Sequence, residues 1–165
     1  MNHVEMKEHK PEVLELKSAY PATPKKLFEP LIVCFACNYC TYAGADYAGT
    51  ARIQYPPNVI VIRHMCSGRY DPLEFLEALR LGADFVWHAG CHPGDCHFLT
   101  GNYKASRRFA LLKKLCEQLG FNPERLILEW VSAAEGDRFA SIVRKLLQKY
   151  EEIGPSPMKN FKEEL

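Results

Sequence analysis

Apolar and polar positions follow two different patterns between residues 31 and 153. Four short apolar runs are bounded by turn-forming residues, which is typical of buried strands. These runs cover residues 31–35, 59–64, 84–88 and 126–131. Stretches with helical spacing or helix-capping residues cover about residues 42–53, 72–82, 102–120 and 132–150. The pattern therefore predicts four strands that alternate with four helices.

Residues typical of helix ends support this assignment. Asp71 and Pro72 fit an N-cap and the first position of a helix, and Gly82 fits its end. Ser132 and Glu135 have the spacing of a capping box, which predicts the start of the last helix. Spacing predicts two buried faces, consisting of Phe109, Leu112, Leu115, Cys116 and Leu119 in the third helix and Phe139, Ile142, Val143, Leu146 and Tyr150 in the last.

The alternation of strands and helices predicts the fold class, which is α/β. Strands that are separated by helices favour one parallel sheet with right-handed crossovers and helices on both faces. We expect a four-stranded sheet with the flavodoxin-like order 2-1-3-4. Residues 30–154 would form this domain, between an extended N-terminal arm at residues 1–29 and a C-terminal tail at residues 155–165.

Six of the seven cysteines lie in three clusters, and each cluster follows one of the first three predicted strands. The clusters are Cys34, Cys37 and Cys40 after the first strand, Cys66 after the second, and Cys91 with Cys96 after the third. Ligands in open α/β sheets bind outside the carboxyl ends of the strands. We therefore expect the three clusters to meet at one edge of the sheet.

Composition and charge exclude several functions. The chain has 165 residues, of which 47% are hydrophobic and 25% charged, with a net charge of +1. A balanced charge predicts no nucleic-acid partner, and no apolar stretch approaches the roughly 20 residues of a membrane span. The charged N-terminal residues lack the apolar core of a secretory signal. We expect a cytoplasmic protein without a membrane partner.

In a reducing compartment, clustered cysteines favour metal binding or redox chemistry over structural disulfides. Four thiolates are the usual ligands of an iron–sulfur cluster or of a structural zinc ion. Cys34 and Cys116 lie at positions where strand or helix spacing predicts a buried, core-forming side chain. Five cysteines remain for four ligand positions, and they are Cys37, Cys40, Cys66, Cys91 and Cys96.

Two other interpretations of the cysteines remain open from the residues alone. Cys37 and Cys40 form a Cys-x-x-Cys pair beside a βαβ pattern, which also fits a thioredoxin-like dithiol oxidoreductase. A zinc-binding interaction module would use the same sulfurs without redox chemistry. No serine triad, paired carboxylates or glycine-rich phosphate loop follows the strands, so we predict no catalytic residues and no nucleotide cofactor.

Histidines near the cysteines are weaker candidates. His92 and His97 each follow a cysteine, and histidine replaces cysteine on one iron of Rieske centres. Because cysteine alone can fill four positions, we expect neither histidine to be a ligand. His64 and His88 lie near strand ends and are expected to be hydrogen-bonded polar groups.

Five longer motifs resemble the delta subunit of methyl-viologen-reducing (F420-non-reducing) hydrogenase. They are CNYCTYAGAD at 37–46, RIQYPP at 52–57, MCSGR at 65–69, GCHPGDCH at 90–97 and GNYK at 101–104. The resemblance extends from Leu31 to Pro155. It implies an iron–sulfur subunit that carries one [2Fe–2S] cluster and transfers electrons without catalysing a reaction of its own.

The same resemblance implies the ligands and the partners. Four of Cys37, Cys40, Cys66, Cys91 and Cys96 would bind the cluster. The partners would be a hydrogenase or formate dehydrogenase-type donor module and the flavoprotein subunit of heterodisulfide reductase. In such complexes the flavin sends the two electrons of a pair to acceptors of different potential, which is called electron bifurcation.

Overall fold

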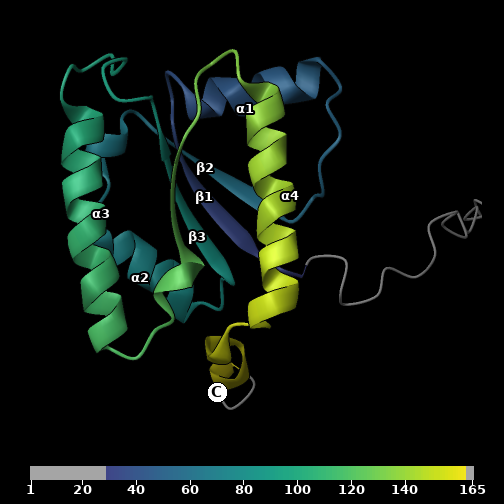
Figure 1. Cartoon of the computed structure of the whole chain (residues 1–165), viewed down its shortest axis with the longest axis vertical. Coiled ribbons are helices and arrows are strands. Elements are labelled where there is room, and N and C mark those ends of the chain that lie inside the picture. Colours follow the sequence, from purple (N-terminus) through teal and green to yellow (C-terminus); the bar gives the residue numbers. More distant parts are fainter. Residues whose placement is uncertain (1–28, 163–165) are drawn as a thin grey trace, which may run out of the picture.

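Four parallel strands form the centre of the structure, a computed structural model that describes residues 29–162 (Figure 1). The strands are β1 (Ile32–Cys37), β2 (Val59–His64), β3 (Phe85–Gly90) and β4 (Leu126–Trp130). They pair in the order β2-β1-β3-β4, and all three pairings are parallel. The predicted sheet and its order are confirmed.

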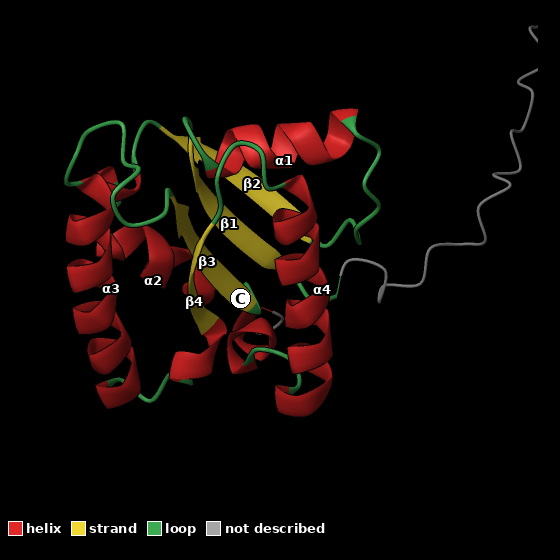
Figure 2. Cartoon of the chain, turned by 45° about the horizontal axis from the view of Figure 1, so that its top comes forward, coloured by secondary structure: helices red, strands yellow, loops and turns green. Residues whose placement is uncertain are grey.

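Two helices cover each face of the sheet (Figure 2). The helices are α1 (Thr41–Thr50), α2 (Pro72–Arg80), α3 (Gly101–Gln118) and α4 (Gly136–Ile153). Helices α1 and α4 pack on one face, and α2 and α3 pack on the other. Three short 3-10 helices connect or follow them: η2 (Ser67–Arg69), η3 (Pro123–Arg125) and η4 (Pro157–Lys162). The predicted coverage of both faces by helices is confirmed.

Alternation along β1 directs neighbouring side chains into two separate cores. Cys34 belongs to the core beneath α1 and α4, whereas Phe35 belongs to the core beneath α2 and α3. Cys116 of α3 is also fully buried, in the same core as Phe35. Burial raises the pKa of both cysteine thiols, so Cys34 and Cys116 are neutral core residues, as predicted.

The start of α2 follows the prediction, whereas the start of α4 does not. Asp71 caps α2 by accepting a hydrogen bond from Leu73 N at 2.9 Å. Ser132 does not cap α4, which begins at Gly136 and has Glu135 at its N-cap position. The Glu135 carboxylate instead accepts a hydrogen bond from Ser132 N at 2.7 Å. One half of the predicted capping box is therefore present, and it holds the loop ahead of the helix.

The predicted buried face of α3 is too wide. Phe109, Leu112 and Cys116 are buried, but 42% of Leu115 and 58% of Leu119 are exposed. Leu115 precedes Cys116 by one residue, which places it about 100° around the helix from the buried stripe. Leu119 lies beyond the last residue of α3. The face of α4 is predicted better, since only Tyr150 of its five positions is incompletely buried.

Asp84 connects the end of the chain to the sheet. Its fully buried carboxylate accepts hydrogen bonds from Leu31 N at 2.7 Å and Ser156 N at 2.8 Å, and it pairs with Lys159 at 2.6 Å. These contacts fix the first described residues of η4 beside β3. The predicted arm lies outside the described residues, apart from its last position, Glu29.

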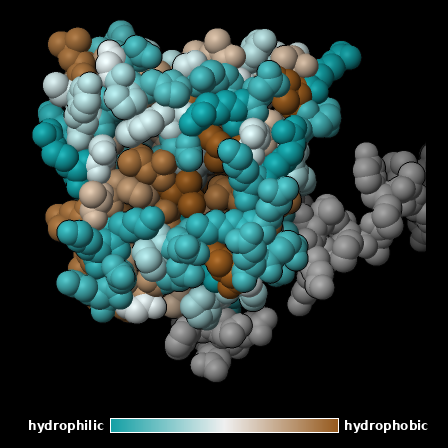
Figure 3. All heavy atoms as spheres, viewed as in Figure 1, coloured by the Kyte–Doolittle hydropathy of each residue, from teal (hydrophilic) through white to brown (hydrophobic). Residues whose placement is uncertain are grey.

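Strand β4 forms one edge of the sheet, and half-buried apolar side chains are visible over it between α3 and α4 (Figure 3). No helix among the described residues is long and apolar enough to cross a membrane.

Candidate metal centre

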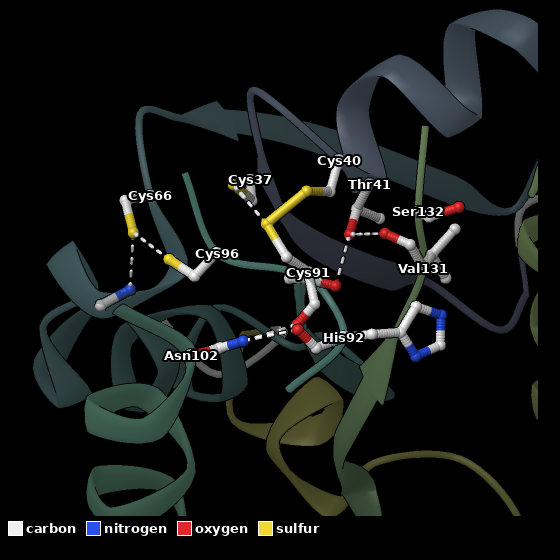
Figure 4. Close-up of a disulfide and its surroundings, with 12 residues drawn as sticks. Cys37, Cys40, Thr41, Cys66, Cys91, His92, Cys96, Asn102, Val131 and Ser132 are labelled. Atoms are coloured by element: carbon white, nitrogen blue, oxygen red, sulfur yellow. Dashed lines mark hydrogen bonds between the residues drawn. A yellow bond between two sulfur atoms is a disulfide. The ribbon is translucent and has the colours of Figure 1, made fainter. Parts of the chain in front are cut away.

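Strands β1, β2 and β3 end at the same edge of the sheet, because they are parallel and in register. Cys37 pairs with His64 at the end of β2, and Ala36 pairs with Ala89 near the end of β3. The segments that follow these strands bring all five candidate cysteines together, as Figure 4 shows. Each of Cys37, Cys40, Cys66, Cys91 and Cys96 is at least nine-tenths buried. The expected meeting of the clusters at one edge is therefore observed.

Three of the sulfur atoms form one group. The Sγ atoms of Cys37, Cys40 and Cys91 all lie within 4.8 Å of one another. Cys40 and Cys91 are joined by a disulfide, whereas Cys37 is a free thiol whose sulfur lies 3.8 Å from that of Cys91. The disulfide therefore does not join the two cysteines of the Cys-x-x-Cys pair.

The other two sulfur atoms form a separate pair. The Sγ atoms of Cys66 and Cys96 lie 3.9 Å apart, and both thiols are free. They are not part of the three-sulfur group, although Cys37 Sγ is 3.9 Å from the carbonyl oxygen of Met65, the residue before Cys66. The five thiols are thus divided into neighbouring groups of three and two.

Both sulfur–sulfur distances suit the binding of a metal. Two thiolates on one tetrahedral metal, at a metal–sulfur distance of about 2.3 Å, lie about 3.8 Å apart. Tetrahedral sulfur sites are typical of zinc and of iron–sulfur clusters. The distances between Cys37 and Cys91 and between Cys66 and Cys96 match this spacing. The residues therefore fit a site in which each of two metal ions binds two cysteines.

The start of α3 favours a thiolate at Cys96. Burial alone raises the pKa of the Cys96 thiol, but backbone N–H groups and the Cys66 thiol outweigh burial, and the pKa is lowered overall. The N–H groups belong to Asn102, Phe98 and Gly101. A helix N-terminus stabilises thiolates because its free N–H groups point at the sulfur. Cys96 is therefore prepared to act as an anionic ligand.

Two glycines allow the cysteine segments to approach one another. A Cβ atom on Gly101 would overlap Cys66 Sγ and would lie 2.9 Å from Cys96 Sγ. A Cβ on Gly68 would lie 2.7 Å from the Cα of Gly101. Any side chain at either position would push η2 and α3 apart. The sulfur pair therefore requires glycine at both positions.

Side-chain hydrogen bonds hold the loop that carries Cys91. The buried Asn102 amide donates to the carbonyl oxygens of Cys91 at 3.3 Å and His92 at 2.6 Å. His92 Nε2 lies 2.6 Å from the Glu135 carboxylate, which also accepts from Ser132 N. The Ser132 N–H and then His92 lower the pKa of Glu135. These contacts fix the Cys91 loop against α3 and the loop before α4.

The histidines have partners that account for them without a metal. His97 stacks on Tyr39 with 4.1 Å between ring centroids, and His64 lies 3.7 Å from Glu74. His88 Nε2 lies 3.1 Å from the carbonyl oxygen of Ser67, and burial lowers the His88 pKa to about 3. His88 is therefore neutral at physiological pH.

A shallow apolar hollow of about 310 Å³ lies beside the Cys66–Cys96 pair. Cys66 lines it directly, and the exposed side chains of Met65 and Phe98 border it. Arg69 and Lys104 supply its charged groups, both of which are basic. The sulfur pair is thus the side of the site from which another molecule can come closest.

Sequence reasoning did not identify the residues that support the cysteines. Asn102, Glu135, Gly68 and Gly101 act through contacts between segments that are distant in the chain. Gly101 gave the only local signal, since glycine is unfavourable at the start of a helix unless something requires it. Their roles become visible only when the strands are paired.

An α/β fold that gathers buried thiols at the carboxyl edge of its parallel sheet belongs to the class of thiolate-ligated metal proteins. Comparison with known families matches residues 32–154 to the methyl-viologen-reducing hydrogenase, delta subunit. Because the match covers most of the chain, the chain belongs to this family.

Individual relatives agree with the family. The chain is 53% identical over 128 residues to an F420-non-reducing hydrogenase iron-sulfur subunit of Archaeoglobus profundus, covering 78% of this chain and 93% of the relative. It is 48% identical over 132 residues to the F420-non-reducing hydrogenase vhc iron-sulfur subunit of Methanococcus voltae, covering 80% and 92%.

A longer relative is also similar. This protein is part of the ferredoxin/F420H2-dependent CoB-CoM heterodisulfide reductase of Methanosarcina acetivorans, and it is 48% identical over 134 residues. The match covers 81% of this chain but 17% of the relative. The same domain therefore occurs both in short chains and within a much longer one.

Proposed function

We propose that the chain is an electron-transfer subunit that carries one [2Fe–2S] cluster. Two of the three sulfurs of Cys37, Cys40 and Cys91 bind one iron, and Cys66 and Cys96 bind the other. The distance between Cys37 and Cys91 suits the first pair, which leaves Cys40 as the fifth cysteine. When bound, the cluster accepts and releases one electron at a time.

The arrangement of the sulfurs in two groups is the observation that carries this proposal. A single zinc ion needs four sulfurs that are all about 3.8 Å from one another. Cys66 and Cys96 are at that distance from each other but are not part of the group of Cys37, Cys40 and Cys91. Two metal ions with two cysteines each account for both groups, as in a [2Fe–2S] centre.

The chain itself holds and shields the cluster. The five cysteines are buried, so the polypeptide excludes water from the sulfurs. The N–H groups at the start of α3 stabilise the Cys96 thiolate, and Asn102 holds the Cys91 loop. Burial and hydrogen bonds of this kind set the potential of an iron–sulfur cluster.

The partners follow from the relatives. Two relatives are named as iron–sulfur subunits of F420-non-reducing hydrogenases, and one contains the domain within a longer chain of a heterodisulfide reductase. We therefore propose that the chain relays electrons between a hydrogenase or formate dehydrogenase-type donor and the flavoprotein subunit of a heterodisulfide reductase. In a bifurcating complex it would be the single-electron carrier next to the flavin.

Analysis of metal and sulfide tests the proposal. Protein purified without oxygen should contain about two iron atoms and about two acid-labile sulfides per chain, and no stoichiometric zinc. Zinc without sulfide would instead support a structural site. Protein that contains neither metal but cycles between dithiol and disulfide would support a thiol oxidoreductase.

A further inference from the structure

Two buried hydroxyl groups close to the cysteines have no hydrogen-bond partner among the described residues. They are Ser67 Oγ and Tyr70 OH, and only 1% of each residue is exposed. Both belong to the segment that directly follows Cys66, in and just after η2. Buried hydroxyls in native proteins almost always have a partner, so these two require an explanation.

The Ser67 side chain lies between two of the cysteine-bearing segments. Ser67 follows Cys66 directly, and a Cβ added to Gly90 would lie 2.6 Å from Ser67 Oγ. Gly90 is the last residue of β3 and precedes Cys91. The hydroxyl therefore lies between the chain at Cys66 and the chain at Cys91. These segments contribute sulfurs to different groups of the site.

The Tyr70 ring is held in place by the aromatic side chains around it. Its centroid lies 4.4 Å from that of His88 and 4.5 Å from that of His64, both in edge-on contacts. Burial raises the pKa of the Tyr70 phenol far above its ordinary value, and thiolate charge at Cys34, Cys37 and Cys66 raises it further. The phenol is therefore always protonated and can only be a donor toward these sulfurs.

The hydroxyls have few alternatives within the protein. His88 uses Nε2 toward the Ser67 carbonyl oxygen, and its Nδ1 atom has no partner among the described residues. Tyr70 OH makes no hydrogen bond to that nitrogen, despite the contact between the two rings. A cluster bound by the five cysteines would add sulfur acceptors on this side of the sheet.

We propose that Ser67 and Tyr70 donate hydrogen bonds to sulfur atoms of the bound cluster and thereby raise its reduction potential. This inference rests on the proposed function. A reduced cluster carries one more negative charge than an oxidised cluster, so a donor stabilises the reduced state more. Hydrogen bonds to the sulfurs are an established determinant of cluster potential. Ser67 and Tyr70 are thus tuning residues and not ligands.

Removal of each hydroxyl tests the inference. Ser67→Ala and Tyr70→Phe each delete one oxygen atom and retain the rest of the side chain. The midpoint potential would be measured by a dithionite titration of the anaerobically purified full chain, followed by visible absorption and EPR. Each variant should be about tenfold harder to reduce, which is a downward shift of about 59 mV for one electron.

Matched variants elsewhere serve as controls. Tyr55→Phe removes a phenol that packs on Phe139, in the core on the other face of the sheet. Ser141→Ala removes a hydroxyl from α4. Both controls should retain the potential of the unmodified protein, so that a shift in Ser67→Ala or Tyr70→Phe reports the hydroxyl at that place.

A second measurement detects the hydrogen bonds directly. After exchange into D2O, pulsed EPR of the reduced cluster should show deuterium coupling that decreases in Ser67→Ala and in Tyr70→Phe. Unchanged potentials and unchanged deuterium coupling in variants with full iron content would overturn the inference and leave the proposed function intact. Loss of the cluster in both variants would also overturn it, because the hydroxyls would then be needed for folding. If unmodified protein contains no cluster, the proposed function itself fails.

Discussion

The sulfur atoms of Cys66 and Cys96 lie 3.9 Å apart although 30 positions separate the two cysteines in the sequence. They come from the segments that follow β2 and β3. These segments touch because Gly68 and Gly101 present no side chains to each other. The geometry of the sulfur pair therefore depends on two glycines as well as on the cysteines.

Gly101→Ala should reduce the iron content of the purified protein severalfold. The added Cβ would overlap Cys66 Sγ and crowd Cys96 Sγ, so the pair could not keep its spacing. Gly49→Ala is the matched control, since an added Cβ there meets nothing within 4 Å and Gly49 also lies in a helix. Iron per chain would be measured after anaerobic purification. Equal iron content in the two variants would show that the approach of Gly101 is unimportant.

Single cysteine-to-alanine variants should divide the five candidates. Cys66→Ala and Cys96→Ala should each abolish the visible absorbance of the cluster, because no third sulfur belongs to their pair. Cys37→Ala and Cys91→Ala should have the same effect, whereas Cys40→Ala should retain the absorbance. An unchanged spectrum for Cys37→Ala or Cys91→Ala would refute this assignment of the ligands.

The two remaining cysteines provide internal controls for that series. Cys34 and Cys116 are buried in the two cores, away from the sheet edge, and are free thiols. Cys34→Ala and Cys116→Ala remove one buried sulfur each, which costs stability but leaves the site complete. Both variants should therefore keep the full absorbance per chain. Loss of absorbance in either one would extend the site into the core.

Asn102→Ala should weaken the protein around the Cys91 loop. It removes a buried amide and leaves the carbonyl oxygens of Cys91 and His92 without this donor. Buried polar groups that lose their partners cost about 1–3 kcal/mol. We expect the free energy of unfolding to fall by about this amount and the cluster to be released faster when an iron chelator is added. Release at the unmodified rate would contradict a positioning role for Asn102.

His88 should make the stability of the protein depend on pH. Burial lowers its pKa to about 3 in the folded chain, whereas an unfolded histidine titrates near about 6.5. The stability that this difference contributes is fully present above about pH 6.5. It is lost as the pH falls, because only the unfolded chain then takes up the proton.

His88→Gln removes this contribution while retaining a group that can donate to the Ser67 carbonyl oxygen. Between about pH 6.5 and about pH 5.5, the unmodified protein should lose about 1 kcal/mol more stability than the variant. Thermal unfolding at a series of pH values measures the difference. Parallel pH profiles for the two proteins would mean that His88 is protonated in the folded state.

The sheet and its order could be predicted because each strand carries its own signal. The runs around Val33, Val61 and Val86 are apolar, and turn residues separate them from the helices. Since parallel strands share one carboxyl edge, the meeting of the cysteines also followed from their places in the sequence. These features depend on neighbours in the chain and on the general rules of α/β folds.

The features that could not be predicted depend on contacts between distant segments. Glu135 was expected to complete a helix cap, but its carboxylate binds His92, which lies 43 positions earlier. The exposure of Leu115 depends on how much of α3 the sheet covers, which its spacing alone does not state. The unpartnered hydroxyls of Ser67 and Tyr70 are equally invisible in the sequence, because they are defined by what does not surround them.

The visible and EPR spectra of anaerobically purified protein, recorded before and after dithionite, test the central claim most directly. A [2Fe–2S] cluster should give broad visible absorption that bleaches on reduction and a rhombic EPR signal from one unpaired electron per chain. A colourless sample without an EPR signal in either state would contradict the assignment of the cluster.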